Sequence, residues 1–346
     1  MLSRVAENLY WMARYLERTE DMARLINATT LLLLDLPPGA RFGWDILLQV
    51  AGVSELYREH YGPPEETRIM RFLIADERNP SAVLSCIHQA RENSRTFRDV
   101  LPAEFWERIN ALFLFGRDHA SASAANRHDR YAFLNELIAR RHALVGLLVG
   151  SMSQDTAYQF IKLGRNMDRA DMTTRIVDVT TAVILPQRDS LREAVGESLW
   201  LGVLRAMSAF EMYRRHVSVQ VRGNQVVNFL LKNGKFPRTV KHCLGEMEVA
   251  LALLPNSGGP LDMVRRARKR LDALRFDDLS PALLHEYLDQ AQKDLGTIHH
   301  AIHREYFDHL AGNRQAGFYA EPRRNPQPEG HHVSTQFQQS VRETSP

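Results

Sequence analysis

The sequence predicts an all-α protein built from two similar helical units. Apolar residues recur at intervals of three and four over long segments, which is the period of an amphipathic helix. Alternating runs of β-branched and aromatic residues, which are typical of strands, are nearly absent. In addition, three motifs of the first half return in the same order in the second half.

The first half is predicted to contain several helices separated by proline and glycine. The first runs from about Ser3, a suitable N-cap residue, to about Leu36, where two prolines and a glycine must end it. A second helix is predicted from roughly Trp44 to His60 and is closed by the sequence Gly-Pro-Pro. A third breaks near Pro80, because proline lacks an amide donor and suits the first turn of the following helix.

The internal matches define the domain organisation. The stretch "RYLERTEDMARLI" returns as "RNMDRADMTTRIV", "ELYREH" as "EMYRRH", and "FLIADERNPSAVLSCI" as "FLLKNGKFPRTVKHCL". The spacing between matched residues changes by only a few residues, which loops absorb more easily than helices do. We therefore predict two copies, 1–150 and 151–311, with about five helices each around a pseudo-twofold axis. Residues 312–346 are polar, proline-rich and without period, which predicts a disordered tail.

Bulk composition excludes several classes of protein. The 346 residues are 44% hydrophobic and 25% charged, a profile typical of globular proteins. The net charge of +3 gives no strong field, so we do not expect nucleic acid as a partner. Two cysteines are too few for a disulfide scaffold. The N-terminal segment carries charges where a signal peptide would be apolar. No apolar run approaches the ~20 residues that a membrane-spanning helix needs. We expect a cytoplasmic protein that does not enter the membrane.

A charged stripe on the first helix is the main candidate site. A helical wheel places its charged residues on about a third of the circumference, opposite an apolar face. The second copy keeps the arginines and replaces Glu17 by aspartate. The candidate cluster is therefore Arg14, Glu17, Arg18, Arg24, Arg165, Asp168, Arg169 and Arg175, with Asp21 on the same stripe of the first copy only.

Three interpretations of this stripe remain open. It can be a solvated face with weak pairs at i,i+3, each worth about 0.2–0.5 kcal/mol. The stripes of the two copies can pair with each other across the pseudo-twofold axis, because a buried arginine requires a partner. They can also line a polar cleft for an anionic ligand, since the planar guanidinium suits a bidentate carboxylate or phosphate.

The second repeated motif brings together Glu55, Tyr57 and His60, and in the other copy Glu211, Tyr213 and His216. Glutamate and histidine five residues apart do not share a helical face, so they are not a metal-binding pair of the ExxH kind. Tyrosine and histidine at i,i+3 do share a face. We therefore predict structural hydrogen bonding by the tyrosine and the histidine at the centre of each unit.

Other candidate groups favour neither a metal site nor ordinary enzyme chemistry. His299 and His303 lie at i,i+4, but they lack the glutamate of the HExxH motif and have no counterpart in the first copy, so no metal is expected. Cys86 and Cys243 fall on apolar stripes and are predicted to be core residues. The sequence contains no glycine-rich phosphate loop after a strand and no GxSxG elbow, and we expect no cofactor.

The stretches "LSRVAENLYWMARYLERTEDMARLI", "LGRNMDRADMTTRIVD" and "FPRTVKHCL" resemble the alpha-E family of bacterial helical proteins. The family is named for a Glu-Arg pair, which is Glu17-Arg18 here, and the resemblance covers nearly all of residues 1–311. Ala13 stands where the family usually has glycine, and Asp168 is shorter than the usual glutamate.

The family has no established activity, but the resemblance implies a type of partner and a type of process. Family members resemble accessory partners of circularly permuted ATP-grasp ligase-like proteins and of transglutaminase-like or proteasome-related proteins, in a system that forms or processes peptide or amide bonds. The alternative is an enzyme of the same pathway. In it, Glu17 or Asp168 would act as general acid or base while the arginines hold a carboxylate or acyl-phosphate. A carboxylate beside arginines is held ionised, which favours the role of base.

Overall fold

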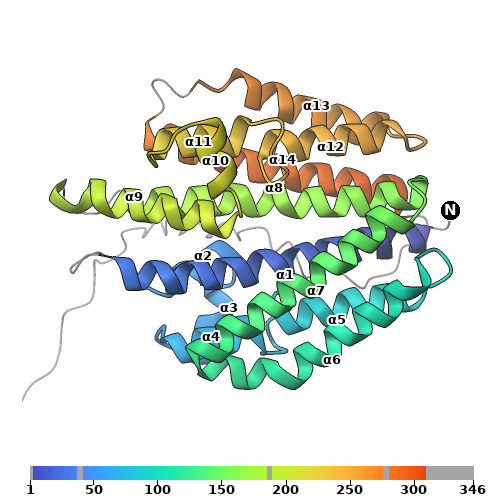
Figure 1. The fold of residues 1–346 in the computed structure, drawn as a ribbon. Coiled ribbons are helices and arrows are strands. Elements are labelled where there is room, and N and C mark those ends of the chain that lie inside the picture. Colours follow the sequence, from blue (N-terminus) through green and yellow to red (C-terminus); the bar gives the residue numbers. More distant parts are fainter. Residues whose placement is uncertain (1–2, 37–41, 185–188, 276–279, 309–346) are drawn as a thin grey trace, which may run out of the picture. The chain divides into compact units, whose positions relative to one another are not determined.

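The computed structural model describes residues 3–36, 42–184, 189–275 and 280–308, and within these ranges the chain is helical, with no strand (Figure 1). The first half contains α1 (Ser3–Asp35), α2 (Asp45–Ala51), α3 (Ser54–Tyr61), α4 (Glu66–Ile74), α5 (Val83–Arg95), α6 (Ala103–Ala125) and α7 (Arg127–Ser151). The second half contains α8 (Thr156–Ile184), α9 (Asp189–Ala206), α10 (Phe210–His216), α11 (Gly223–Lys232), α12 (Val240–Ala252), α13 (Gly258–Ala273) and α14 (Pro281–Tyr306). The predicted all-α class is confirmed, and the tail predicted at 312–346 lies outside the described residues.

Helices α1 and α8 form the centre of the bundle and lie side by side (Figure 1). On one side α5 and α7 pack against α1, and α6 packs on both of them. On the other side α12 and α14 pack against α8, and α13 packs on both of them. None of the helices in the described ranges has a stretch long and apolar enough to cross a bilayer.

Helix α1 is buried on nearly all of its faces, because α5, α7, α8, α9 and α14 all contact it. Leu9, Met12 and Leu16 belong to its buried apolar residues, and Arg14 and Glu17 are equally buried. The interpretation of the charged stripe as a solvated face is therefore wrong. Charges that are removed from water in this way must be compensated by partners inside the protein.

The two central helices approach each other closely at Gly164. A Cβ atom at this position would lie 2.1 Å from the carbonyl oxygen of Tyr10 on α1. Both the glycine and the oxygen belong to helical backbone, so no rotation of a side chain could relieve such a contact. The absence of a side chain at Gly164 thus allows the close spacing of α1 and α8. This spacing in turn determines which side chains of the two helices can contact each other.

Several predicted helix boundaries need correction. The helix predicted from Trp44 to His60 is divided into α2 and α3, because Gly52 between them adopts a φ of +69°, a left-handed conformation that ends α2. Helix α5 begins only at Val83, so Pro80 lies in the preceding turn and not in the first helical turn. The described residues of each half thus contain seven helices, not about five.

The order of helices is compatible with the predicted duplication. In both halves a long central helix leads, through shorter helices, to three helices that pack one upon the next. Matched cysteines make matched contacts: the Cys86 thiol lies 3.8 Å from the Pro80 carbonyl oxygen, and the Cys243 thiol lies 3.5 Å from that of Pro237. The pseudo-twofold relation itself stays a prediction, and superposition of 1–150 on 151–311 would test it.

Candidate functional site

One end of the charged cluster is centred on the carboxylate of Asp168 in α8. Arg14 donates from Nε to Oδ1 at 3.0 Å, and its Nη2 lies 3.0 Å from the same oxygen. Arg18 donates from Nη2 to Oδ1 at 2.7 Å and from Nε to Oδ2 at 3.3 Å. Two arginines one turn apart on α1 therefore hold one buried carboxylate of α8, which locks the two central helices together.

The far side of Arg14 contacts aromatic residues and a histidine of α14. Its guanidinium lies 4.8 Å from the ring centre of Trp11, and its Nη1 lies 3.4 Å from Nδ1 of His299. The hydroxyl of Tyr10 lies 2.9 Å from the same ring nitrogen. Burial, together with the positive charge of Arg14, lowers the pKa of His299 to about 2. The imidazole is therefore neutral at physiological pH, and its Nδ1 lies between two groups that can donate, the Tyr10 hydroxyl and Nη1 of Arg14.

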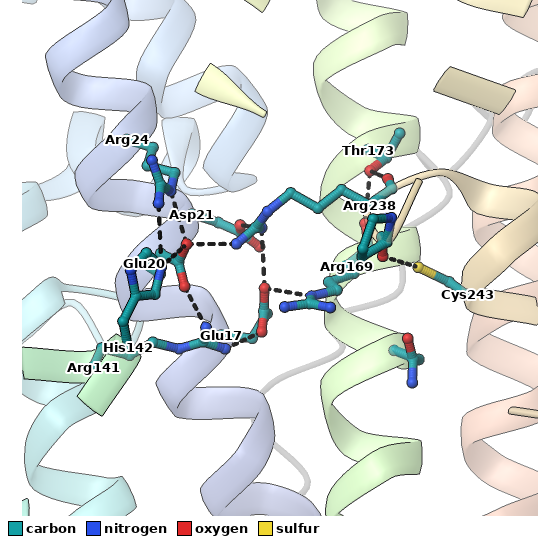
Figure 2. Close-up of polar contacts among 12 residues, drawn as sticks. Glu17, Glu20, Asp21, Arg24, Arg141, His142, Arg169, Thr173, Arg238 and Cys243 are labelled. Atoms are coloured by element: carbon teal, nitrogen blue, oxygen red, sulfur yellow. Dashed lines mark hydrogen bonds and ion pairs between the residues drawn. The ribbon is translucent and has the colours of Figure 1, made fainter. Parts of the chain in front are cut away.

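The other end of the cluster is centred on Glu17 of α1, which is fully buried (Figure 2). Its Oε1 accepts from Nε of Arg169 at 2.7 Å and lies 3.0 Å from Nη1 of Arg238, and its Oε2 accepts from Nη2 of Arg141. Burial alone would raise the pKa of Glu17, but Arg141, Arg169 and Arg238 lower it to about 2. The carboxylate of Glu17 thus links α1 to Arg141 of α7, to Arg169 of α8 and to Arg238, which lies just before α12.

Glu20 continues this network by one turn of α1. Its Oε1 accepts from Nη2 of Arg238 at 2.6 Å and from Nε of Arg24 at 2.8 Å, and it lies 3.0 Å from Nε2 of His142. Its Oε2 forms an ion pair with Arg141. Burial opposes ionisation, but these cationic partners and the hydrogen bond of His142 hold the pKa of Glu20 far below its usual value.

Asp21 has fewer cationic partners among the described residues than Glu17 or Glu20 has. Its Oδ1 forms an ion pair with Arg238, but its buried Oδ2 has no hydrogen-bond partner in the part of the chain that the structure describes. Burial raises the pKa of Asp21 to about 7, and the negative charges of Glu17 and Glu20 add to this effect, while Arg238 opposes it. Asp21 is therefore a carboxyl group that takes up a proton near neutral pH.

This shift predicts a pH-dependent contribution to stability. Between the ordinary pKa of 3.8 and the raised value of about 7, folded protein holds a proton on Asp21 that the unfolded chain releases. The stability contributed by this group is therefore complete below about pH 4 and is lost as the pH rises through 7. We expect the free energy of unfolding of wild-type protein, measured by urea titration, to fall relative to that of Asp21→Asn as the pH is raised from 5 to 8. Other titrating groups are common to both proteins, so parallel curves would contradict the shift.

The structure brings most of the candidate residues together as pairs between helices. Arg14, Arg18 and Arg169 meet Asp168 or Glu17 across the α1–α8 contact. Arg24 and Arg175 instead pair within their own helices at i,i+4, with Glu20 and Asp171, at 2.8 Å and 2.9 Å respectively. Arg165 is the exception, because it makes no hydrogen bond or ion pair with any described residue and its Nε is buried.

Neither of two hollows in the described part of the chain coincides with the cluster. One is apolar and is lined by Leu25, Ile176 and Leu199 among others. The other lies on the surface beside Arg270 and Tyr287. The ion pairs between α1 and α8 correspond to pairing of the two stripes, with Arg165 left over.

Sequence reasoning missed two arginines that complete the network. Arg141 occupies a position on the buried stripe of α7, between Leu137 and Leu144. A charged residue at an apolar-stripe position is a signal that could have identified it. Arg238 directly follows Pro237 in a repeated motif, where the first copy has Ser81, and nothing in its local sequence indicates that it reaches α1.

The second repeated motif is structural, but only its tyrosines are buried. The Tyr57 hydroxyl donates to the Pro63 carbonyl oxygen at 3.4 Å, and that of Tyr213 to the Gln220 carbonyl oxygen at 3.0 Å. The remaining members are exposed, namely Glu55, His60, Glu211 and His216. The prediction that these histidines join structural hydrogen bonds at the centre of each unit is therefore wrong. Each motif makes up most of a short helix, and within the motif only the tyrosine is buried.

The cysteines and the histidines of α14 do not form reactive sites in the structure. Cys86 and Cys243 are fully buried, and burial raises the pKa of each thiol to about 12, which confirms that both are core residues. Within the described residues no three histidine, cysteine, aspartate or glutamate side chains are grouped so that they could hold a metal ion. His299 instead supports the Arg14 side of the charged network.

Comparisons with known proteins agree with the resemblance in the sequence. The model of the Alpha-E family, described as a predicted alpha-helical domain with a conserved ER motif, matches residues 1–307. Uncharacterized proteins of Mycobacterium bovis and of two Mycobacterium tuberculosis strains are each 22% identical over 337 residues. These matches cover 90% of this chain, and the chain spans about 37% of the length of these relatives. No solved structure matches the chain.

Proposed function

Because the chain belongs to the alpha-E family, we propose that it is a helical accessory protein that binds a circularly permuted ATP-grasp ligase-like protein. The pair would act in a system that forms or processes peptide or amide bonds, with a transglutaminase-like protein as a further candidate partner. A cytoplasmic location is part of this proposal. The family resemblance of residues 1–311 supports the choice of partner.

The observation that carries the non-catalytic role is the state of the Glu-Arg pair. Glu17 is fully buried and contacts three arginines, and Arg18 is engaged with Asp168. Side chains that hold α1, α7 and α8 together are not free to bind and release a substrate. The motif thus serves the fold, and the outer faces of the surrounding helices are left for a partner.

Co-purification tests this proposal directly. The protein is co-expressed with a circularly permuted ATP-grasp ligase-like protein from the same organism, purified through a tag on one partner, and analysed by size-exclusion chromatography with light scattering. We expect a stable complex of defined stoichiometry and a changed rate of ATP turnover. An ATP-grasp enzyme from an unrelated pathway is the control. Failure to form a complex, together with unchanged ATP turnover, would overturn the accessory role.

One observation favours an enzyme of the same pathway as the second candidate. A pKa of about 2 makes Glu17 a weak base, whereas Asp21, with a pKa of about 7 and an oxygen without a hydrogen-bond partner in the described structure, suits proton transfer near neutral pH. The enzyme alternative therefore moves from Glu17 and Asp168 to Asp21. If Asp21→Asn abolished product formation while the complex and its ATP turnover persisted, this candidate would replace the accessory role.

A further inference from the structure

Arg165 differs from the other arginines between α1 and α8 in having no counter-ion. It lies on α8, one turn before Arg169, and is half-buried. Its Nε is buried and has no hydrogen-bond partner among the described residues. The cost falls on this Nε, because it is removed from water and nothing in the described protein replaces the water, although the side chain as a whole keeps partial contact with solvent.

The surroundings of Arg165 explain why the chain does not satisfy it. Burial lowers the pKa of Arg165, and the like charges of the neighbouring Arg169 and Arg141 lower it further. Two carboxylates act on it electrostatically, and both are engaged elsewhere. Glu17 is held by Arg141, Arg169 and Arg238. Glu246 of α12 forms an ion pair with Lys162 at 2.7 Å.

The first repeat motif shows what such a position accepts. Arg14 aligns with Arg165, and Arg18 aligns with Arg169, in the two matched stretches of sequence. Arg14 and Arg18 together grip a single carboxylate, that of Asp168, with hydrogen bonds of 2.7–3.3 Å. In the second pair, Arg169 does contact the matching carboxylate, that of Glu17, which Arg141 and Arg238 also hold. No ion pair in the described part of the chain joins Glu17 to Arg165, so Arg165 lacks the carboxylate contact that Arg14 has.

We propose that Arg165, with Arg169 and Arg141 beside it, forms a binding site for a carboxylate that comes from outside the chain. The carboxylate belongs to a peptide, either at its C-terminus or on an acidic side chain. It enters beside α8, where Lys162, Arg165 and Arg169 keep partial contact with solvent. The inference does not depend on the identity of the partner proposed above.

The first test compares the stability of two variants without ligand. Arg165→Met removes an uncompensated charge but keeps an apolar stem of similar length, so its thermal midpoint is expected to equal or exceed that of wild-type protein. Arg169→Met, one turn along the same helix, removes a partner of Glu17 and is expected to lower the midpoint by many degrees. If Arg165→Met fell as far as Arg169→Met, Arg165 would have a partner within the chain and the inference would be overturned.

The second test measures binding to the full chain at constant ionic strength. N-acetylglycine supplies a main-chain carboxylate, and the methylamide of N-acetylaspartate supplies a side-chain carboxylate. The uncharged methylamide of N-acetylglycine and inorganic phosphate serve as comparisons. We expect a saturable rise of the thermal midpoint with one or both carboxylates, and the larger rise identifies the source. The rise should be lost in Arg165→Met and weakened in Arg165→Lys, since lysine cannot form the bidentate contact.

The results of this second test either support or overturn the site. A rise with the carboxylates that disappears in Arg165→Met supports it. A rise that persists in Arg165→Met, a rise with phosphate alone, or no rise with any probe overturns it. None of these results depends on formation of a complex with an ATP-grasp protein, so failure of the carboxylate site is distinguishable from failure of the proposed function.

Discussion

Replacing Glu17 by glutamine is expected to lower the free energy of unfolding by about 3–5 kcal/mol, the usual cost of breaking a buried ion pair by removing one partner. Glutamine keeps the shape of the side chain but removes the charge that compensates Arg141, Arg169 and Arg238. These three guanidinium groups would then remain buried near one another with insufficient negative charge. The loss arises from the charges left behind and not from a cavity.

Urea unfolding monitored by circular dichroism measures this effect. Glu55→Gln is the matched control, because Glu55 is exposed on α3 and the same chemical change there should alter the free energy of unfolding by less than about 0.5 kcal/mol. Equal, small effects of the two substitutions would mean that Glu17 is solvated in solution, contrary to the buried network.

Replacing Gly164 by alanine is expected to destabilise the protein by about 3 kcal/mol, near the upper end of the usual range for overpacking. The added methyl group would lie 2.1 Å from the Tyr10 carbonyl oxygen, so α1 and α8 must move apart. Such a movement also lengthens the hydrogen bonds from Arg14 and Arg18 to Asp168. Steric strain and weakened ion pairs therefore act in the same direction.

The control for this substitution is Gly146→Ala on α7. Gly146 is an exposed helical glycine, and a Cβ there would meet no atom within 4 Å. Alanine should therefore stabilise the helix by about 0.5–1 kcal/mol through its higher helix propensity. If both glycine variants gained stability, the close contact between α1 and α8 would not exist in solution.

The sequence was sufficient to predict the helical class and the extent of the first helix. It also gave pairing of the two charged stripes as one of three open interpretations. Periodicity and the end of the first helix before its two prolines depend on local sequence, and the structure agrees with both. The division at Gly52 is also local, but a single glycine within an apolar pattern is compatible with a continuous helix as well as with a break.

The partners of the charged residues could not be predicted, because they come from distant parts of the chain. Arg141 and Arg238 lie 124 and 217 residues from Glu17 and Asp21, respectively. A helical wheel of α1 shows a charged face, and it cannot show that α7, α8 and the residues before α12 cover that face. For the same reason Arg165 could not be distinguished from Arg14 by sequence, although one has a carboxylate partner and the other has none among the described residues.

The central claim is that the Glu-Arg motif is an internal ion-pair network joining the two halves of the protein. A double-mutant cycle with Arg18→Met and Asp168→Asn measures this most directly, since these residues form a bidentate pair between α1 and α8. The claim predicts a coupling free energy of about 2 kcal/mol or more, near the upper part of the range for residues in contact. A coupling below about 0.5 kcal/mol, as for an exposed surface pair, would contradict it.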